Sequence, residues 1–146
     1  AIGSLDADFN EFIDATNTDV ADERVFQNTP DLTASATLTY QNSMDLFGKS
    51  GTFFAIGSGS HRDDASQFEM PTPELDQPAF TIWDLSLVWE DDEGQWSAGL
   101  HAKNLIDEEY KVAGYYYPAP TLGLEGSFTA FYGNPRTITG TVEYRF

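Results

Sequence analysis

Apolar and polar side chains alternate strictly along the carboxyl-terminal segment, and this feature constrains the fold more than any other. From Ile138 to Phe146 the even positions are Ile, Gly, Val, Tyr and Phe, whereas the odd positions from Thr137 to Arg145 are Thr, Thr, Thr, Glu and Arg. Successive side chains of a β-strand point to opposite faces of the sheet. The segment is therefore predicted to be a strand with one apolar and one polar face.

The same alternation predicts six strands in all, over residues 2–12, 31–41, 51–61, 81–90, 95–106 and 135–146. It is less regular over 51–61, where Phe53-Phe54, Gly57 and Gly59 interrupt it and suggest a bulge. Short links of turn-forming residues join the second strand to the third and the fourth to the fifth. The other three links are long and cover residues 13–29, 62–80 and 111–134. Short and long links alternate, so one end of the sheet should carry tight turns and the other extended loops.

This division is typical of outer-membrane β-barrels, which have short periplasmic turns and long extracellular loops. Their strands alternate between lipid-facing apolar and lumen-facing polar residues, whereas the Thr, Ser, Asp, Glu and Arg of the polar face here are too hydrophilic for a dry protein core. Trp89 and Trp96 flank the short turn, where aromatic rings suit a membrane interface. The predicted fold class is all-β, as an antiparallel, up-and-down segment of a transmembrane β-barrel.

Composition narrows the function. A formal charge of −17, from 24 acidic and 7 basic side chains, repels phosphate backbones, so no nucleic-acid partner is predicted. The chain has no cysteine, which removes disulfides and thiolate chemistry. Of the two histidines, His101 falls on the polar face without a recognisable partner for acid–base catalysis, and the residues around His61 do not form a nucleophile elbow. No enzymatic activity, catalytic residue, cofactor or metal site is predicted.

Three short blocks, in order along the chain, resemble the TonB-dependent outer-membrane receptors. Lys103–Tyr110 is similar to the N-L-x-D-x-x-Y block near the end of that family. Gly133-Asn134-Pro135-Arg136-Thr137, followed by the strand to Phe146, resembles the G-x-P-R-T … Y-x-F finish of these receptors. Gln27-Asn28-Thr29-Pro30 resembles an N-T-P sequence that precedes an earlier barrel strand. The resemblance spans nearly the whole chain.

The resemblance implies the last six strands of a 22-stranded barrel in the Gram-negative outer membrane. It implies energised uptake of a scarce nutrient such as a ferric siderophore (iron uptake), haem, cobalamin or an oligosaccharide. The implied partners are outer-membrane lipid and lipopolysaccharide, the rest of the barrel and its plug domain, the TonB complex and the barrel-assembly machinery. Six strands cannot close a barrel, so the chain is expected to be a piece of a longer receptor, with the plug domain and the TonB-binding segment outside it.

Two groups of residues are candidates for function. Aromatic residues of the last long loop are candidates for stacking on the substrate: Tyr115, Tyr116, Tyr117, Phe131 and Tyr132. The apolar face of the last strand resembles the signal read by the assembly machinery, and it comprises Ile138, Val142, Tyr144 and Phe146. Acidic residues between Asp14 and Glu23 suggest a solvated loop, with divalent-cation binding as the alternative.

Two other functional classes remain open. One is a soluble all-β module that binds carbohydrate, and the other is a passive outer-membrane porin. A requirement for detergent separates the membrane proteins from the soluble module. A plug domain upstream separates the receptor from the porin.

Overall fold

The computed structural model describes residues 1–117 and 123–146 of the chain. It is an all-β structure with two antiparallel sheets and a single 3-10 turn, η1, at Ala21–Glu23. The strands are β1 (Ile2–Ser4), β2 (Leu32–Ser43), β3 (Gly51–Arg62), β4 (Phe80–Asp91), β5 (Trp96–Lys103), β6 (Lys111–Tyr117), β7 (Ser127–Tyr132) and β8 (Thr137–Tyr144). Within these residues, no helical segment is long and apolar enough to cross a bilayer.

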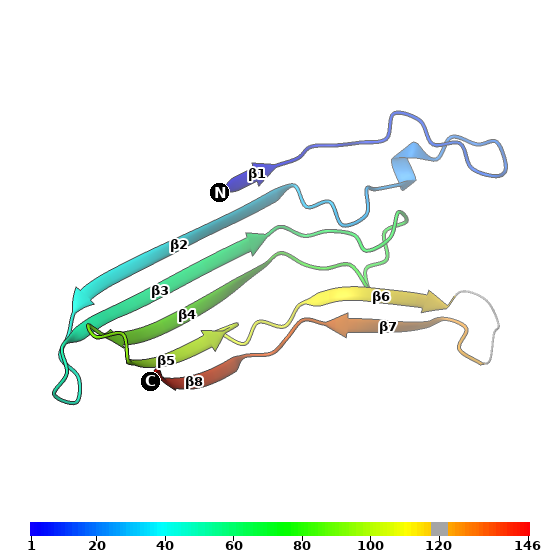
Figure 1. Cartoon of the computed structure of the whole chain (residues 1–146). Coiled ribbons are helices and arrows are strands. Elements are labelled where there is room, and N and C mark those ends of the chain that lie inside the picture. Colours follow the sequence, from blue (N-terminus) through cyan, green and yellow to red (C-terminus); the bar gives the residue numbers. More distant parts are fainter. Residues whose placement is uncertain (118–122) are drawn as a thin grey trace.

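The main sheet has six strands in the order β1-β2-β3-β4-β5-β8, and every neighbouring pair is antiparallel. The second sheet is the β6–β7 hairpin, which continues β5 and β8 beyond the loop end of the main sheet (Figure 1). The β2–β3 and β4–β5 turns and the carboxyl terminus share the opposite end (Figure 1). The predicted all-β class and antiparallel arrangement are confirmed. Among the described residues the sheet is open, with β1 and β8 as its edges.

The strand register places the alternating residues on two distinct faces. Leu38 pairs with Gly57, Leu85 with Ala102, and Ala98 with Val142, so these side chains share one face, which we call the apolar face. The other, polar face carries the threonines and serines of β2 and β8. It also carries Phe54, Ile56, Ile82 and Val88 in its centre, so it is less uniformly polar than the alternation predicted.

Three sequence-based expectations are wrong in detail. The first strand, predicted over 2–12, ends at Ser4, and beyond it the Phe9 ring stacks on Phe26 of the returning segment at 4.2 Å. The link predicted over 111–134 contains the β6–β7 hairpin, and residues 118–122 of it lie outside the described part. The bulge suggested in the third strand is absent, because β3 keeps an uninterrupted register with both neighbours.

The remaining strands lie close to their predicted bounds. The second, third and fourth predicted strands, over 31–41, 51–61 and 81–90, correspond to β2, β3 and β4 within two residues at each end. The fifth, predicted over 95–106, ends at Lys103, because Asn104 adopts a left-handed backbone conformation with φ of 49°. The last strand, predicted over 135–146, is β8.

Candidate functional site

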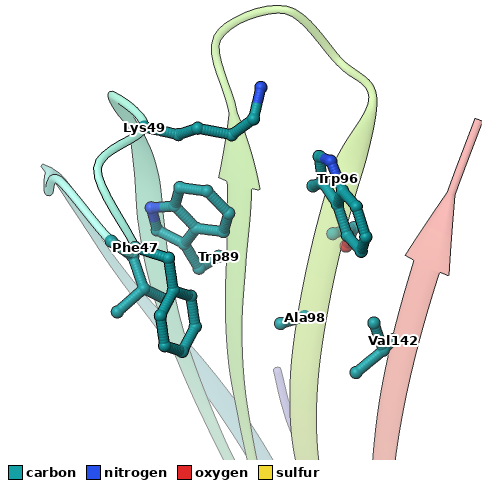
Figure 2. Close-up of a pocket in the computed structure, with 8 residues that line it drawn as sticks. Phe47, Lys49, Trp89, Trp96, Ala98 and Val142 are labelled. Atoms are coloured by element: carbon teal, nitrogen blue, oxygen red, sulfur yellow. The ribbon is translucent and has the colours of Figure 1, made fainter.

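An apolar groove of about 380 Å³ lies on the apolar face at the turn end of the sheet. Figure 2 shows the rings of Phe47, Trp89 and Trp96 around it, with Lys49 at its rim. Ala98 and Val142, which face each other across β5 and β8, form its floor. The groove therefore combines a large aromatic surface with one cationic group at its edge.

Local backbone geometry sets the position of the Trp89 ring. Trp89 is only 5 % exposed, and its indole Nε1 donates a 2.8 Å hydrogen bond to the Met44 carbonyl in the β2–β3 turn. The ring covers Gly51, where an added Cβ would come within 2.7 Å of the indole carbons. A side chain at position 51 would clash with the Trp89 ring and with the Glu90 carbonyl oxygen, so this glycine permits the close approach of β4. In contrast, Phe47 is 93 % exposed at the tip of the turn.

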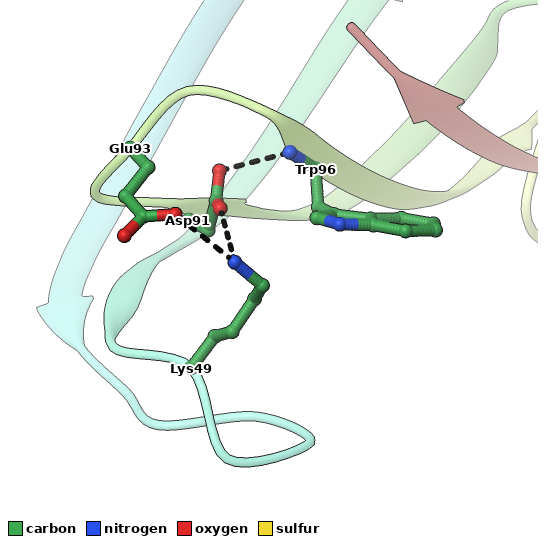
Figure 3. A network of polar contacts seen from close by, with 4 residues as sticks. All are labelled: Lys49, Asp91, Glu93 and Trp96. Carbon is green, nitrogen blue, oxygen red and sulfur yellow. Dashed lines mark hydrogen bonds and ion pairs between the residues drawn. The ribbon is translucent and has the colours of Figure 1, made fainter. Parts of the chain in front are cut away.

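A polar network joins the two short turns above the groove (Figure 3). Lys49 Nζ lies 3.4 Å from Asp91 Oδ2 and 3.1 Å from Glu93 Oε2. The other oxygen of Asp91 accepts a 2.9 Å hydrogen bond from the Trp96 backbone N–H. The hydrogen bond to Glu93, together with the charges of both carboxylates, raises the pKa of Lys49. Lys49 therefore stays charged and holds the β2–β3 turn against the β4–β5 turn.

The structure divides the predicted substrate-stacking aromatics between the two faces of the β6–β7 hairpin. Tyr115 and Phe131 share one face, with their ring centroids 5.8 Å apart in an edge-to-face pair. Tyr116 lies on the other face and stacks on Phe128 at 4.9 Å. Tyr117 pairs with Ser127 and Tyr132 with Lys111 in the register. The five residues share the hairpin without forming a single surface, and stacking on substrate stays a prediction for all five.

The Tyr116 face of the hairpin also carries Gly114, which packs against the loop between β3 and β4. Leu75 of that loop is 1 % exposed, and a Cβ at Gly114 would lie 2.8 Å from a Leu75 methyl group. Lys111 Nζ donates to the carbonyls of Glu74 and Asp76 at 3.0 and 2.9 Å, and its backbone N–H donates to Gln77. These contacts fasten the hairpin to the loop and leave its Tyr115 face free.

The predicted assembly residues follow the apolar face of β8. Ile138 and Val142 are 64 % and 75 % exposed, and Tyr144 packs on Trp96 with 4.7 Å between ring centroids. Phe146 contacts Tyr144 edge to face at 5.0 Å and is otherwise fully exposed. The outer edge of β8 has no neighbouring strand among the described residues, so its backbone groups are free to pair with another strand. Glu143, on the polar face, pairs with Arg145 at 2.8 Å.

The sequence-based search for functional residues missed the side chains of Asn104 and Asp107, in the turn that follows β5. Asn104 is 5 % exposed, and its amide donates to the carbonyls of Glu108 and Asn134 at 2.8 and 3.1 Å. Asp107 accepts the Arg136 N–H at 2.8 Å. Both side chains therefore join the start of β6 to the start of β8. Asn104 and Asp107 both adopt a left-handed backbone conformation here, which Asn and Asp tolerate best among non-glycine residues. Their residue types could therefore have indicated this turn in the sequence.

Tyr110 and Gly133 complete the same junction. The Tyr110 ring stacks on Phe80 at 4.6 Å and covers Gly133, where any Cβ would overlap the ring. The Gly133 N–H donates to the Tyr110 carbonyl at 2.8 Å. The two sequence blocks that resemble receptor motifs near the end of the chain are thus in direct contact with each other.

In the acidic loop between β1 and β2, the carboxylates accept hydrogen bonds from backbone N–H groups of the same loop. Asp14 accepts hydrogen bonds from the Thr16 and Thr18 amides, and Asp19 accepts them from Phe12 and Ala21. These bonds lower the pKa of both carboxyls, with the Thr18 amide as the largest cause for Asp14 and the Phe12 amide for Asp19. In residues 1–117 and 123–146, no group of three acidic or histidine side chains is arranged to hold a metal ion.

Comparison with protein-family models, with curated proteins and with solved structures gives no significant match.

Proposed function

We propose that this chain forms part of the wall of a TonB-dependent outer-membrane receptor that imports a scarce, large nutrient. The observation that carries the proposal is the apolar face of the main sheet, which no second layer covers in the described part of the chain. Leu38 is 77 % exposed, Val142 75 % and Leu100 49 %, although all three lie within regular strands. A ring of lipid around the barrel would cover these side chains.

The total exposed surface supports the same proposal. The chain exposes 10205 Å², whereas a compact soluble protein of 16.2 kDa exposes about 7,500 Å². The buried apolar residues of the described part are only Ala65, Leu75, Trp89 and Ala102. A soluble carbohydrate-binding module would place its apolar strand face in a core, so this surface disfavours that alternative.

The aromatic groove suits a lipid interface. Trp and Tyr concentrate at the boundary between hydrocarbon and water because their rings are apolar and their N–H or O–H groups are polar. Trp89, Trp96 and Tyr144 lie together at the turn end, just below the charged network of Lys49. In the proposed receptor this end lies at the periplasmic surface, and the long loops with the β6–β7 hairpin face the outside.

Site-directed spin labelling tests the membrane assignment, and the absence of native cysteine makes single-site labelling straightforward. Val142→Cys and its neighbour Thr141→Cys are labelled after the protein is reconstituted in phospholipid vesicles. The label at 142 should collide with dissolved oxygen, which concentrates in lipid, and the label at 141 with a water-soluble nickel complex. Equal access of the nickel complex to both labels would contradict the proposal.

Transport assays separate the receptor from a passive porin. In cells, uptake through a TonB-dependent receptor should stop when the proton-motive force is collapsed, because the import is energised. Uptake through a porin should continue unchanged. Continued uptake would therefore assign the same wall to a passive pore.

A further inference from the structure

We propose that a small cavity at the loop end of the sheet binds an oxyanion, either a carboxylate or a phosphate, carried by the imported nutrient. The cavity has a volume of about 110 Å³, which suits one such group. It lies where the β1–β2 loop, the end of β3, the β3–β4 loop, the start of β4 and the start of β6 meet. Its lining comprises Asn28, Arg62, Ala65, Gln67, Gln77, Phe80, Tyr110, Lys111 and Val112.

The charge of this lining is the reverse of the charge of the chain. The formal charge of the whole chain is −17, yet the cavity is lined by two cationic side chains, Arg62 and Lys111, and by no carboxylate. Within the described residues, Arg24, Lys49, Lys103 and Arg145 are in ion pairs, whereas no carboxylate lies within 4.0 Å of Arg62, Lys111 or the exposed Arg136. Of these three, only Arg62 and Lys111 line the cavity. Two uncompensated cations in one cavity favour an anionic ligand.

Arg62 carries hydrogen-bonding capacity that the fold leaves unused. Its terminal Nη2 donates to the Asn28 carbonyl at 3.0 Å, and no described residue accepts a hydrogen bond from its Nη1. Its Nε is buried and has no surface open to the cavity. The planar guanidinium can offer two parallel N–H groups to a carboxylate or a phosphate.

The neighbours of Arg62 hold the site in place. Lys111 lines the cavity, and its Nζ is held by the carbonyls of Glu74 and Asp76 rather than by a carboxylate. The stacked rings of Phe80 and Tyr110 form an apolar wall. Arg62 pairs with Thr33 across β2 and with Phe80 across β4, which places it on the polar face that would line the lumen. The assignment of the anion to the nutrient rests on the proposed function.

The test follows the arginine side chains by nuclear magnetic resonance in an uncharged detergent. Sodium acetate, citrate and phosphate are titrated at constant ionic strength, and the Nε–H resonances of Arg24, Arg62, Arg136 and Arg145 are recorded. We expect a saturable shift at Arg62 and none at Arg136, which is exposed and lines no part of the cavity. The anion that binds more tightly identifies the oxyanion as carboxylate or phosphate.

Matched substitutions give the second measurement. Arg62→Gln and Arg136→Gln each remove one positive charge, but only Arg62→Gln should weaken anion binding, by about tenfold or more. Absence of any Arg62 shift in the wild type, or equal affinity in both variants, would overturn the proposal. The spin-label measurement is independent, because failure of the membrane assignment leaves the Arg62 titration unchanged, and failure of the titration leaves the exposed apolar face in place.

Discussion

Replacement of Asn104 by alanine removes the side chain that joins the start of β6 to the start of β8. Three hydrogen bonds are lost, namely those from the amide to the Glu108 and Asn134 carbonyls and the 2.8 Å bond from the Glu108 N–H to Oδ1. At about 1 kcal/mol each, they contribute about 3 kcal/mol. Alanine in the left-handed conformation adds about 1 kcal/mol, so Asn104→Ala should lower the free energy of unfolding by about 4 kcal/mol.

Urea titration of the detergent-solubilised protein, followed by tryptophan fluorescence, measures the change. Asn104→Gly loses the same bonds without the backbone strain, so it should retain about 1 kcal/mol more stability than Asn104→Ala. Asn42→Ala is the control, because Asn42 is exposed on β2, and it should change the stability by less than about 0.5 kcal/mol. A loss for Asn104→Ala no larger than that of the control would refute the reasoning.

Three further predictions concern other contacts. Gly133→Ala should cost about 1–3 kcal/mol of unfolding free energy by overlap with the ring above it, whereas Gly140→Ala, where a Cβ meets nothing within 4 Å, should be neutral in the same urea assay. Trp89→Phe should destabilise the protein by about 2 kcal/mol, because the indole hydrogen bond to the Met44 carbonyl is lost. Trp96 is 40 % exposed, so Trp96→Phe should destabilise the protein by clearly less. Equal thermal stabilities of these two variants would contradict this prediction. The pKa of the Asp14 carboxyl is lowered in the folded state, so Asp14 stabilises the β1–β2 loop at pH values above the ordinary carboxyl pKa. This stabilisation is lost as the pH falls through the lowered pKa of the folded state. Over that acid range, amide exchange in the loop should accelerate in the wild type and show no such acceleration in Asp14→Asn.

Local sequence patterns predicted most of the main sheet. In β2, β4, β5 and β8 apolar side chains recur at every second position, and the observed register places them on one face. Such a pattern is readable from sequence because the two-residue period of a strand does not depend on which strands it pairs with. Even β3, where Phe53-Phe54 and two glycines blur the alternation, was predicted as a strand, although without its regular register.

Contacts between distant segments caused the errors. The alternation after β1 continues to Phe9, but the strand ends at Ser4 and the ring of Phe9 stacks on Phe26, which is 17 residues further along the chain. The Tyr115–Tyr117 run lies in a hairpin because β7 supplies its partners, and Leu75 holds the hairpin through Gly114. The candidate oxyanion site was equally hidden, since Arg62 and Lys111 lie far apart in the sequence and meet only when four loop-end segments converge.

The sequence by itself determined that the chain forms antiparallel strands with one apolar face, short turns at one end and long loops at the other. Backbone sterics and the alternation of side chains act over a few residues, so these properties can be read locally. Only the tertiary structure decided that the apolar face stays uncovered in the described residues, that Asn104 and Tyr110 join two remote strands, and that two cations share a cavity without a carboxylate. Those properties depend on which segments come into contact, and the packing of the whole sheet and its loops determines these contacts.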